Sequence, residues 1–369
     1  MIDYEELLDN STKAVIQKPE DLGLCLVTGA AGFLGKNIVK ALLEQGCRVR
    51  ALINRTPLGF IHHNLEVFTG SVTDRDAMEK ACEGVETIFH SAAVIAIMGG
   101  AFTRKSYYDQ AYDANVIGTK NLLAAAVSNG SKRFIHTSSV DVAFDYSDQP
   151  NMQESAAYSQ NPRSVYQKTK ILAEKDVLEA NGKNGLYTCA IRPGGIYGPE
   201  KNEMLDRFVE QLVSGKLIMC IGHPSIETGE TYIGSLVHSE LLAALHLGDN
   251  GKTKGSANGQ AYFINDGQPM NPFEFFRDLI EGMGYKKPKI YLPAAIVLPF
   301  LYIAEFIVFK FNLNEPPLCP HAIKKIACTH WGSIEKAQNE IGYNPLKTVK
   351  EALAECLDYC KTLQVAAKK

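Results

Sequence analysis

The chain has 369 residues, of which 46% are hydrophobic and 21% are charged, and its formal net charge is -3. This length is enough for one large core and a smaller second domain. The small negative charge gives no electrostatic basis for binding nucleic acid or an anionic membrane surface. The nine cysteines are scattered and contain no CxxC motif, so we expect no metal site and a reduced, cytoplasmic protein.

Residues 24–54 predict a strand, a glycine-rich turn, a helix and a second strand, in that order. The turn contains Gly29, Gly32 and Gly35. Glycine in such a turn lets the backbone approach a pyrophosphate, and the N-terminus of the helix adds unpaired N–H groups and a partial positive charge. Because the flanking strands and helix are present, the glycine spacing indicates a dinucleotide-binding turn.

Strand and helix patterns continue to alternate up to residue 199, which predicts a Rossmann-type, doubly wound parallel sheet covered by helices on both faces. From residue 200 helices predominate. We therefore expect an N-terminal arm at 1–20, which lacks the apolar core of a secretory signal, and a dinucleotide-binding domain at 21–199. A smaller, mainly helical substrate-binding domain at 200–369 should cover the carboxyl edge of the sheet, with an interleaved boundary.

A tyrosine followed four residues later by a lysine occurs four times, but proline separates the partners in three of these pairs. Only Tyr166 and Lys170 share an uninterrupted predicted helix, where they are neighbours. A free tyrosine titrates near pH ~10, and a neighbouring ammonium lowers that pKa towards the range useful for acid–base catalysis. Ser139 follows the fifth predicted strand, and its hydroxyl is a candidate to hold a substrate oxygen beside Tyr166.

Taken together, these motifs resemble the extended short-chain dehydrogenase/reductase superfamily. The residues that carry the resemblance are TGAAGFLG at 28–35, Ser139, the Tyr166/Lys170 pair and RPGGIYGP at 192–199. In the second half, TYIGSLVH at 231–238 and GQAYFIND at 259–266 resemble the 3β-hydroxysteroid dehydrogenase/isomerase family. That family includes sterol-4-carboxylate decarboxylating dehydrogenases, and the resemblance spans nearly the whole chain.

The resemblance implies a role for each candidate catalytic residue. Tyr166 would be the acid/base, Lys170 its pKa-lowering and ribose-binding partner, and Ser139 the ligand of the substrate oxygen. Asn115 matches the family asparagine near the lysine, although the sequence alone fits a helix-surface residue equally well. Besides Tyr166 and Lys170, the candidate coenzyme contacts are Gly29, Gly32, Phe33, Leu34, Asn54, Arg55, Ser71, Val72, Ala92, Ala93, Pro193 and Ile196.

Two positions depart from the family pattern. Members that use NAD carry an acidic residue at the end of the second strand, where this chain has Ile53, Asn54 and Arg55. A guanidinium there can pair with a ribose phosphate, so we expect NADP(H) to be favoured over NAD(H). After the third strand the chain has Gly70-Ser71 in place of Gly-Asp, which leaves Ser71 and the backbone of Val72 for the adenine.

The resulting hypothesis is an oxidoreductase that interconverts a secondary alcohol and a ketone on a large apolar substrate, a 3β-hydroxysteroid or sterol-like molecule. The first alternative is a nucleotide-sugar epimerase or dehydratase on the same scaffold, which should place basic residues in its second half. The second is a non-catalytic dinucleotide sensor, which would not need the serine, tyrosine and lysine. A homodimer is compatible with the sequence.

The apolar stretch 293–311 approaches the ~20 residues of a membrane-spanning helix. Pro299 interrupts it, and Glu305 and Lys310 lie in its second half, so we expect no spanning segment. Three interpretations stay open: a buried helix pair, a wall of the substrate pocket, or a segment that dips into one leaflet. We favour peripheral membrane contact of an otherwise cytoplasmic protein.

Overall fold

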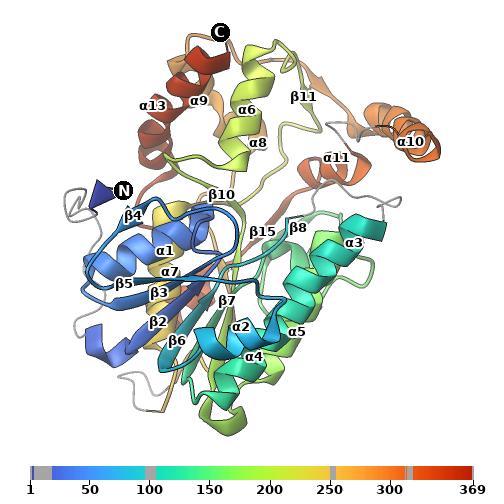
Figure 1. Cartoon of the computed structure of the whole chain (residues 1–369). Helices are drawn as coiled ribbons and strands as arrows, with labels where there is room; N and C mark the ends of the chain where they lie inside the picture. The colour runs from blue at the N-terminus through green and yellow to red at the C-terminus, as the bar shows by residue number, and fades with distance from the viewer. Residues whose placement is uncertain are drawn as a thin grey trace.

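The computed structural model describes residues 2–3, 19–95, 105–249, 255–311, 313 and 319–367. Its centre is a sheet of seven parallel strands in the order β13-β9-β7-β6-β2-β3-β5 (Figure 1). Their bounds are β2 (Leu24–Thr28), β3 (Arg48–Ile53), β5 (Leu65–Thr69), β6 (Val85–His90), β7 (Arg133–Thr137), β9 (Tyr187–Pro193) and β13 (Ala261–Ile264). This arrangement confirms the predicted doubly wound α/β fold.

Helices cover both faces of the sheet. One face packs against α1 (Phe33–Glu44) and α7 (Ile233–Leu245), and the other against α2 (Arg75–Ala81), α4 (Gly118–Ser128) and α5 (Val165–Glu179). In α1, Ile38, Val39 and Leu42 are buried at helical spacing. The helix ends at Glu44 with Gln45 as its C-cap, so the expected C-cap at Gly46 is one residue late. Gly46 follows directly, and its φ of +78° suits a residue without a side chain. Burial of these apolar stripes against the strands is the main stabilising contribution to the layer structure.

The chain changes direction in the sheet between β2 and β6. From β2 it proceeds to β3 and β5 on one side, and then returns to form β6, β7 and β9 on the other. In open α/β sheets, ligands bind outside the carboxyl ends of the strands at this switch point. The glycine turn follows β2 and the Ala92-Ala93 segment follows β6, so both lie at that point.

The second half of the chain forms a smaller, mainly helical part beyond the carboxyl edge of the sheet (Figure 1). Its helices are α6 (Glu203–Val213), α8 (Pro272–Phe275), α9 (Arg277–Gly282), α10 (Ala294–Lys310), α11 (Pro320–Ile326) and α13 (Val349–Ala367). Helix α12 (Glu335–Ile341) packs instead on β13 and α7. Strand β13 and helix α7 come from beyond residue 199 but belong to the sheet layers. The expected domain limits stay a prediction.

Two short parallel strand pairs join the two parts: β10 (Gly195–Tyr197) with β12 (Glu230–Tyr232), and β8 (Gln149–Met152) with β15 (His330–Gly332). A third pair, β11 (Cys220–Ile221) with β14 (Tyr291–Leu292), lies within the second half of the chain. Near the N-terminus, β1 (Ile2–Asp3) pairs with β4 (Phe60–Ile61). In the first half of the chain, α3 (Lys105–Tyr112) lies beside α5. Most of the expected N-terminal arm, residues 4–18, lies outside the described residues.

Helix α10 differs from what the sequence suggested. It is one continuous helix through Pro299, and Glu305 is its only buried residue. The interpretation as a buried helix pair is therefore wrong. Figure 1 shows α10 at the periphery of the smaller part, next to α11. None of the helices in the described part of the chain combines the length and apolar character needed to span a bilayer.

Candidate active site

The glycine turn has the geometry that a pyrophosphate needs. Gly29 adopts a φ of +65°, and a Cβ on it would lie 2.9 Å from Ala92 Cα. A Cβ on Gly35 would overlap the carbonyl oxygen of Gly29. Gly32 is the N-cap of α1, and no described side chain caps the helix there. The first-turn N–H groups of α1, at Phe33 and Leu34, therefore fit a dinucleotide phosphate.

The residues after β6 are held against the end of β2. Ser91 Oγ donates to the Thr28 carbonyl at 2.7 Å, and Ala92 N–H donates to Thr28 Oγ1 at 3.1 Å. Ala92 and Ala93 are both partly exposed. Small side chains at this point leave room for a coenzyme to cross the switch point.

The ends of β3 and β5 present the candidate residues for the adenine ribose. Asn54 and Arg55 are exposed directly after β3, which ends without a carboxylate. After β5, Ser71 Oγ lies 2.8 Å from Thr73 Oγ1. Val72 packs on the Cα of Gly118, where a Cβ would lie 2.6 Å from Val72 Cγ2. The structure thus places these candidates at the same edge as the glycine turn.

The structure brings Ser139 and Tyr166 together. Ser139 follows β7 and caps a short 3₁₀ helix, with its Oγ accepting from Asp141 N–H at 3.2 Å. Tyr166 lies in the first turn of α5, which Ser164 caps by accepting from Gln167 N–H. A hydrogen bond from Ser139 favours the phenolate of Tyr166, but burial and the charge of Asp141 raise the pKa of Tyr166 above its usual value.

Lys170 is buried and donates from Nζ to the Thr137 carbonyl at 2.5 Å. Burial lowers the pKa of Lys170 to about 8, which the carboxylates of Glu174 and Glu240 oppose. The expectation that Lys170 lowers the pKa of Tyr166 is not met in this geometry. The physical reason is that desolvation dominates the phenol, while the ammonium is directed to the backbone of Thr137.

Asn115 is buried, so the alternative of a helix-surface residue is wrong. It lies in a π-helical turn, η3 (Asp113–Ile117). Its Oδ1 accepts from Val94 N–H at 2.7 Å, and its Nδ2 donates to the Val94 carbonyl and to Thr169 Oγ1, each at 3.0 Å. Asn115 therefore ties the segment after β6 to α5, one residue before Lys170.

Two buried carboxylates that sequence reasoning missed support Lys170. Glu174 forms an ion pair with Arg192, whose Nη2 lies 2.6 Å from Glu174 Oε1, and Tyr158 OH donates to the same oxygen at 2.9 Å. On α7, Glu240 Oε1 accepts from Thr137 Oγ1 at 2.7 Å. Burial raises the pKa of Glu240 to about 7. No local sequence pattern marks Glu240, because it reaches the site from the opposite face of the sheet.

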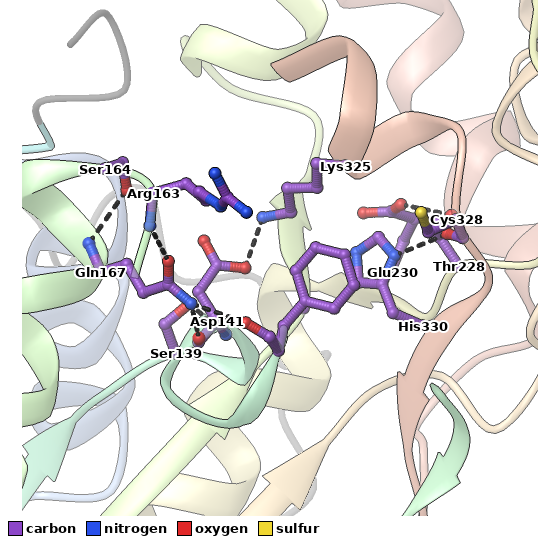
Figure 2. Close-up of polar contacts among 12 residues, drawn as sticks. Ser139, Asp141, Arg163, Ser164, Gln167, Thr228, Glu230, Lys325, Cys328 and His330 are labelled. Carbon is purple, nitrogen blue, oxygen red and sulfur yellow. Dashed lines mark hydrogen bonds and ion pairs between the residues drawn. The ribbon is translucent and has the colours of Figure 1, made fainter. Parts of the chain in front are cut away.

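A second polar cluster lies beside Ser139. Lys325 on α11 forms an ion pair with Asp141, with Nζ 2.6 Å from Oδ1. Figure 2 shows Lys325 between Asp141 and Glu230. Glu230 accepts from Thr228 Oγ1 at 3.0 Å. Two of the candidate coenzyme contacts come shortly before Glu230 in the chain. Pro193 is buried at the end of β9, and Ile196 is half-buried in β10. Long sequence separation, for example from Asp141 to Lys325, explains why the sequence did not reveal it.

A pocket of about 600 Å³ lies beside the first turn of α5. Ser164 and Val165 line it next to Tyr166, and Tyr302 and Glu305 of α10 line it from the smaller part. His321 and Lys324 of α11 complete this side. The pocket thus lies between the helix that carries Tyr166 and the exposed helix α10.

The parallel sheet, the glycine turn and the Ser139, Tyr166 and Lys170 arrangement define an extended short-chain dehydrogenase/reductase. The sequence profile described as the 3-beta hydroxysteroid dehydrogenase/isomerase family matches residues 26–294, and the chain belongs to this family. The protein is thus an NAD(P)-dependent oxidoreductase. The resemblance inferred from the sequence is confirmed.

Relatives agree with this assignment. The chain is 38% identical over 340 residues to a 3-beta-hydroxysteroid dehydrogenase of Mycolicibacterium neoaurum, with 92% of each chain covered. It is also 38% identical to a 3 beta-hydroxysteroid dehydrogenase/Delta 5-->4-isomerase of Mycobacterium tuberculosis, covering 93% of this chain and 92% of that protein. A sterol-4-alpha-carboxylate 3-dehydrogenase, decarboxylating, of Mus musculus is 31% identical, covering 89% and 88%.

Solved structures share the fold. A UDP-glucose 4-epimerase of Thermotoga maritima superposes with a TM-score of 0.70 at 21% identity, covering 92% of this chain and 99% of that one. At this identity the likeness concerns the scaffold alone.

Proposed function

We propose that the protein interconverts a 3β-hydroxyl group and a 3-ketone on a steroid or sterol-like substrate, using a nicotinamide coenzyme. The observation that carries this proposal is the hydrogen-bonded Ser139 and Tyr166 pair, with Lys170 on the same helix, beside the glycine turn. The names of relatives that match this chain over about nine tenths of their own length support the substrate class. The pocket between α5 and α10 is the proposed entrance for that substrate. The region after residue 199 would form the main wall of the substrate site.

The proposed reaction assigns one task to each side chain. Ser139 holds the substrate oxygen, and Tyr166 gives its phenolic proton to that oxygen in reduction and receives it in oxidation. A bound nicotinamide ring supplies or accepts the hydride. Lys170 holds the ribose, and Asn115 fixes the turn of α5 that positions Lys170. The raised pKa of Tyr166 keeps its hydroxyl protonated at neutral pH, which suits donation to a ketone.

The test of the proposed function is Tyr166→Phe, which keeps the ring and removes the proton donor. Loss of a general acid or base costs about 10²–10⁴-fold in turnover, and we expect a fall of at least about 10²-fold with coenzyme binding retained. Turnover of a panel of 3β-hydroxysteroids is followed by the absorbance of the reduced nicotinamide. Near-normal turnover of the variant on a confirmed substrate would contradict the assignment of Tyr166.

We further propose that NADP(H) is preferred over NAD(H). Arg55 is exposed at the end of β3, where no carboxylate is present to repel a 2′-phosphate. Dissociation constants for NADPH and NADH should favour NADPH, and Arg55→Ala should weaken NADPH selectively. The exposed Arg75→Ala at the start of α2 is the matched control. Tighter NADH binding that Arg55→Ala leaves unaltered contradicts this preference.

We also propose that α10 rests on a lipid surface without crossing it. Its large apolar side chains are exposed, with Phe300 at 70% and Ile303 at 59%. A helix that presents such a face can bury it at the headgroup boundary. Since Tyr302 of the same helix lines the pocket, an apolar substrate could then pass from lipid to the site.

Liposome co-sedimentation tests the lipid contact. Intact protein should sediment with vesicles of phosphatidylcholine and phosphatidylserine, and Phe306→Glu/Phe309→Glu should remain in the supernatant. Val67→Glu/Leu172→Glu changes two other exposed apolar residues, on β5 and α5, and should sediment like the intact protein. Intact protein that stays in the supernatant with neutral and anionic vesicles alike excludes the lipid contact.

A further inference from the structure

The pocket between α5 and α10 has a positively charged rim. Four cationic residues, each exposed or half-exposed, form this cationic rim: Lys105, Arg163, Lys168 and Lys324. Two carboxylates also line the pocket, those of Asp109 and the buried Glu305. Four positive and two negative side chains, with His321 counted as neutral, give the lining a formal charge of +2, whereas the whole chain carries -3. The net charge of the chain therefore conceals a local excess of positive charge.

Most of this positive charge is not neutralised by the protein itself. Lys105 Nζ lies 2.6 Å from Asp109 Oδ2, so these two side chains form an ion pair on α3. Within the residues that the structure describes, Arg163, Lys168 and Lys324 form no ion pair with a carboxylate. Like charges that line one pocket repel each other, and an anion between them removes that repulsion. Arginine and lysine are the side chains that commonly bind phosphate, so the cationic rim favours a phosphate group.

The cationic rim is continuous with the exposed apolar surface of α10. Tyr302 belongs to both, because its side chain lines the pocket and is 42% exposed. The Lys324 ammonium lies 5.6 Å from the centre of the Tyr302 ring, and on α10 itself the Lys310 ammonium lies 5.8 Å from the centre of the Phe306 ring. Aromatic rings with ammonium groups beside them are typical of surfaces at the headgroup level of a membrane. An anion that binds here is therefore expected to carry apolar chains.

We propose that the cationic rim binds the phosphate of an anionic phospholipid whose acyl chains lie against α10. Arg163, Lys168 and Lys324 supply the charges that the phosphate neutralises. The exposed side chains of α10, such as Phe300 and Ile303, supply the apolar contact with the chains. The proposal rests on the proposed lipid contact of α10, and it adds the chemistry of the headgroup and the residues that recognise it.

A phosphate on the cationic rim leaves the buried side of the pocket open to a substrate. The buried lining residues are Ser164 and Val165, which precede Tyr166, and Pro320 and His321 of α11. The volume of about 600 Å³ lies in the range of sites that hold drug-sized ligands. A headgroup at the rim would thus hold the mouth of the pocket at the lipid surface, where an apolar substrate dissolves.

Partitioning of the full chain into two kinds of vesicle tests this proposal. One kind contains phosphatidylcholine alone, and the other contains phosphatidylcholine mixed with phosphatidylglycerol, whose net charge is that of its phosphate. We expect the intact protein to bind the mixed vesicles more tightly. Each basic residue at an anionic surface contributes about fivefold to partitioning, so Lys168→Gln/Lys324→Gln should bind the mixed vesicles about 25-fold more weakly. Its binding to phosphatidylcholine should change by less than about twofold, because that contact depends on α10.

A matched variant controls for the change in net charge. Lys350→Gln/Lys361→Gln removes two exposed lysines from α13, which Figure 1 shows away from α10. This variant should keep the preference of the intact protein for the mixed vesicles within about twofold. If both double variants lose the preference equally, the attraction comes from net charge and the proposed rim site is overturned. A full preference in Lys168→Gln/Lys324→Gln overturns it as well.

Titration calorimetry with inorganic phosphate separates a lipid from free phosphate as the occupant. We expect no saturable binding of inorganic phosphate, because this ion lacks the acyl chains that contact α10. Saturable phosphate binding by an intact protein that does not prefer the mixed vesicles would overturn the lipid as the occupant.

The failure of this inference is distinguishable from that of the proposed lipid contact. Phe306→Glu/Phe309→Glu should bind neither kind of vesicle, whereas Lys168→Gln/Lys324→Gln should lose only the preference for the mixed kind. Intact protein that binds both kinds equally refutes the headgroup site and leaves the contact of α10 standing. Intact protein that binds neither kind refutes both.

Discussion

The buried ion pair between Arg192 and Glu174 gives a stability prediction whose size follows from its geometry. The side chains are only 4% and 0% exposed, and Arg192 Nε lies 3.1 Å from each carboxylate oxygen while Nη2 reaches Oε1 at 2.6 Å. Arg192→Met keeps much of the volume but leaves Glu174, among these contacts, with the Tyr158 hydroxyl as its hydrogen-bond donor. Removing one partner of a buried pair typically costs about 3–5 kcal/mol, because the remaining charge stays desolvated.

The prediction is that Arg192→Met lowers the free energy of unfolding by about 3–5 kcal/mol at pH 7, and that adding Glu174→Leu recovers most of this loss. Urea unfolding followed by the fluorescence of the single tryptophan, Trp331, measures both changes. The exposed pair of Lys183 and Glu179 is the control, since losing it should cost under about 1 kcal/mol. A loss under about 1 kcal/mol in Arg192→Met, or a double variant no more stable than the single one, would refute this reasoning.

Two further predictions concern Lys170 and the carboxylate behind it. Lys170→Ala should lower both turnover and coenzyme affinity, measured by steady-state kinetics and fluorescence titration, and an unaltered affinity would exclude the ribose contact. Glu240→Gln removes a negative charge that raises the pKa of Lys170, so the alkaline limb of kcat/KM should move to lower pH. Because burial raises the pKa of Glu240 from 4.5 to about 7, the folded state binds its proton more tightly and stability falls as pH rises through this window. Glu240→Gln should show a smaller fall in urea unfolding between pH 5 and pH 8, since the raised pKa values of Glu230 and Asp266 still contribute to it. An equal fall in both proteins would contradict the prediction.

Local sequence patterns were sufficient to predict the parallel sheet and the coenzyme-binding turn. The glycine spacing, the apolar runs and the one proline-free Tyr166/Lys170 helix are signals that lie within a few residues of one another. Those signals predicted the doubly wound parallel sheet and the dinucleotide-binding turn after its first strand, but not the order of the strands. Ser139 followed from the same reasoning, because side chains at the carboxyl ends of neighbouring parallel strands lie at one edge.

Other features depend on contacts that a local pattern does not contain. Asp141 and Lys325 are 184 residues apart, and their meeting depends on how α11 lies over the site. The burial of Asn115 depends on the π-helical turn, which rotates it towards Val94 and Thr169. Pro299 lies in the second turn of α10, where it removes one backbone hydrogen bond, and the helix continues because that single loss is tolerated near its start.

The pairing of β13 with β9 has a consequence for how this protein can be divided. Residues 261–264 supply the outer strand next to residues 190–193, and α7 covers the sheet from the same half of the chain. A polypeptide that stopped at residue 199 would lack both elements and would expose the edge of β9 and an apolar face of the sheet. We therefore expect a fragment that ends at residue 199 not to fold stably by itself. During synthesis the sheet can gain its outer strand only after residues 261–264 have emerged.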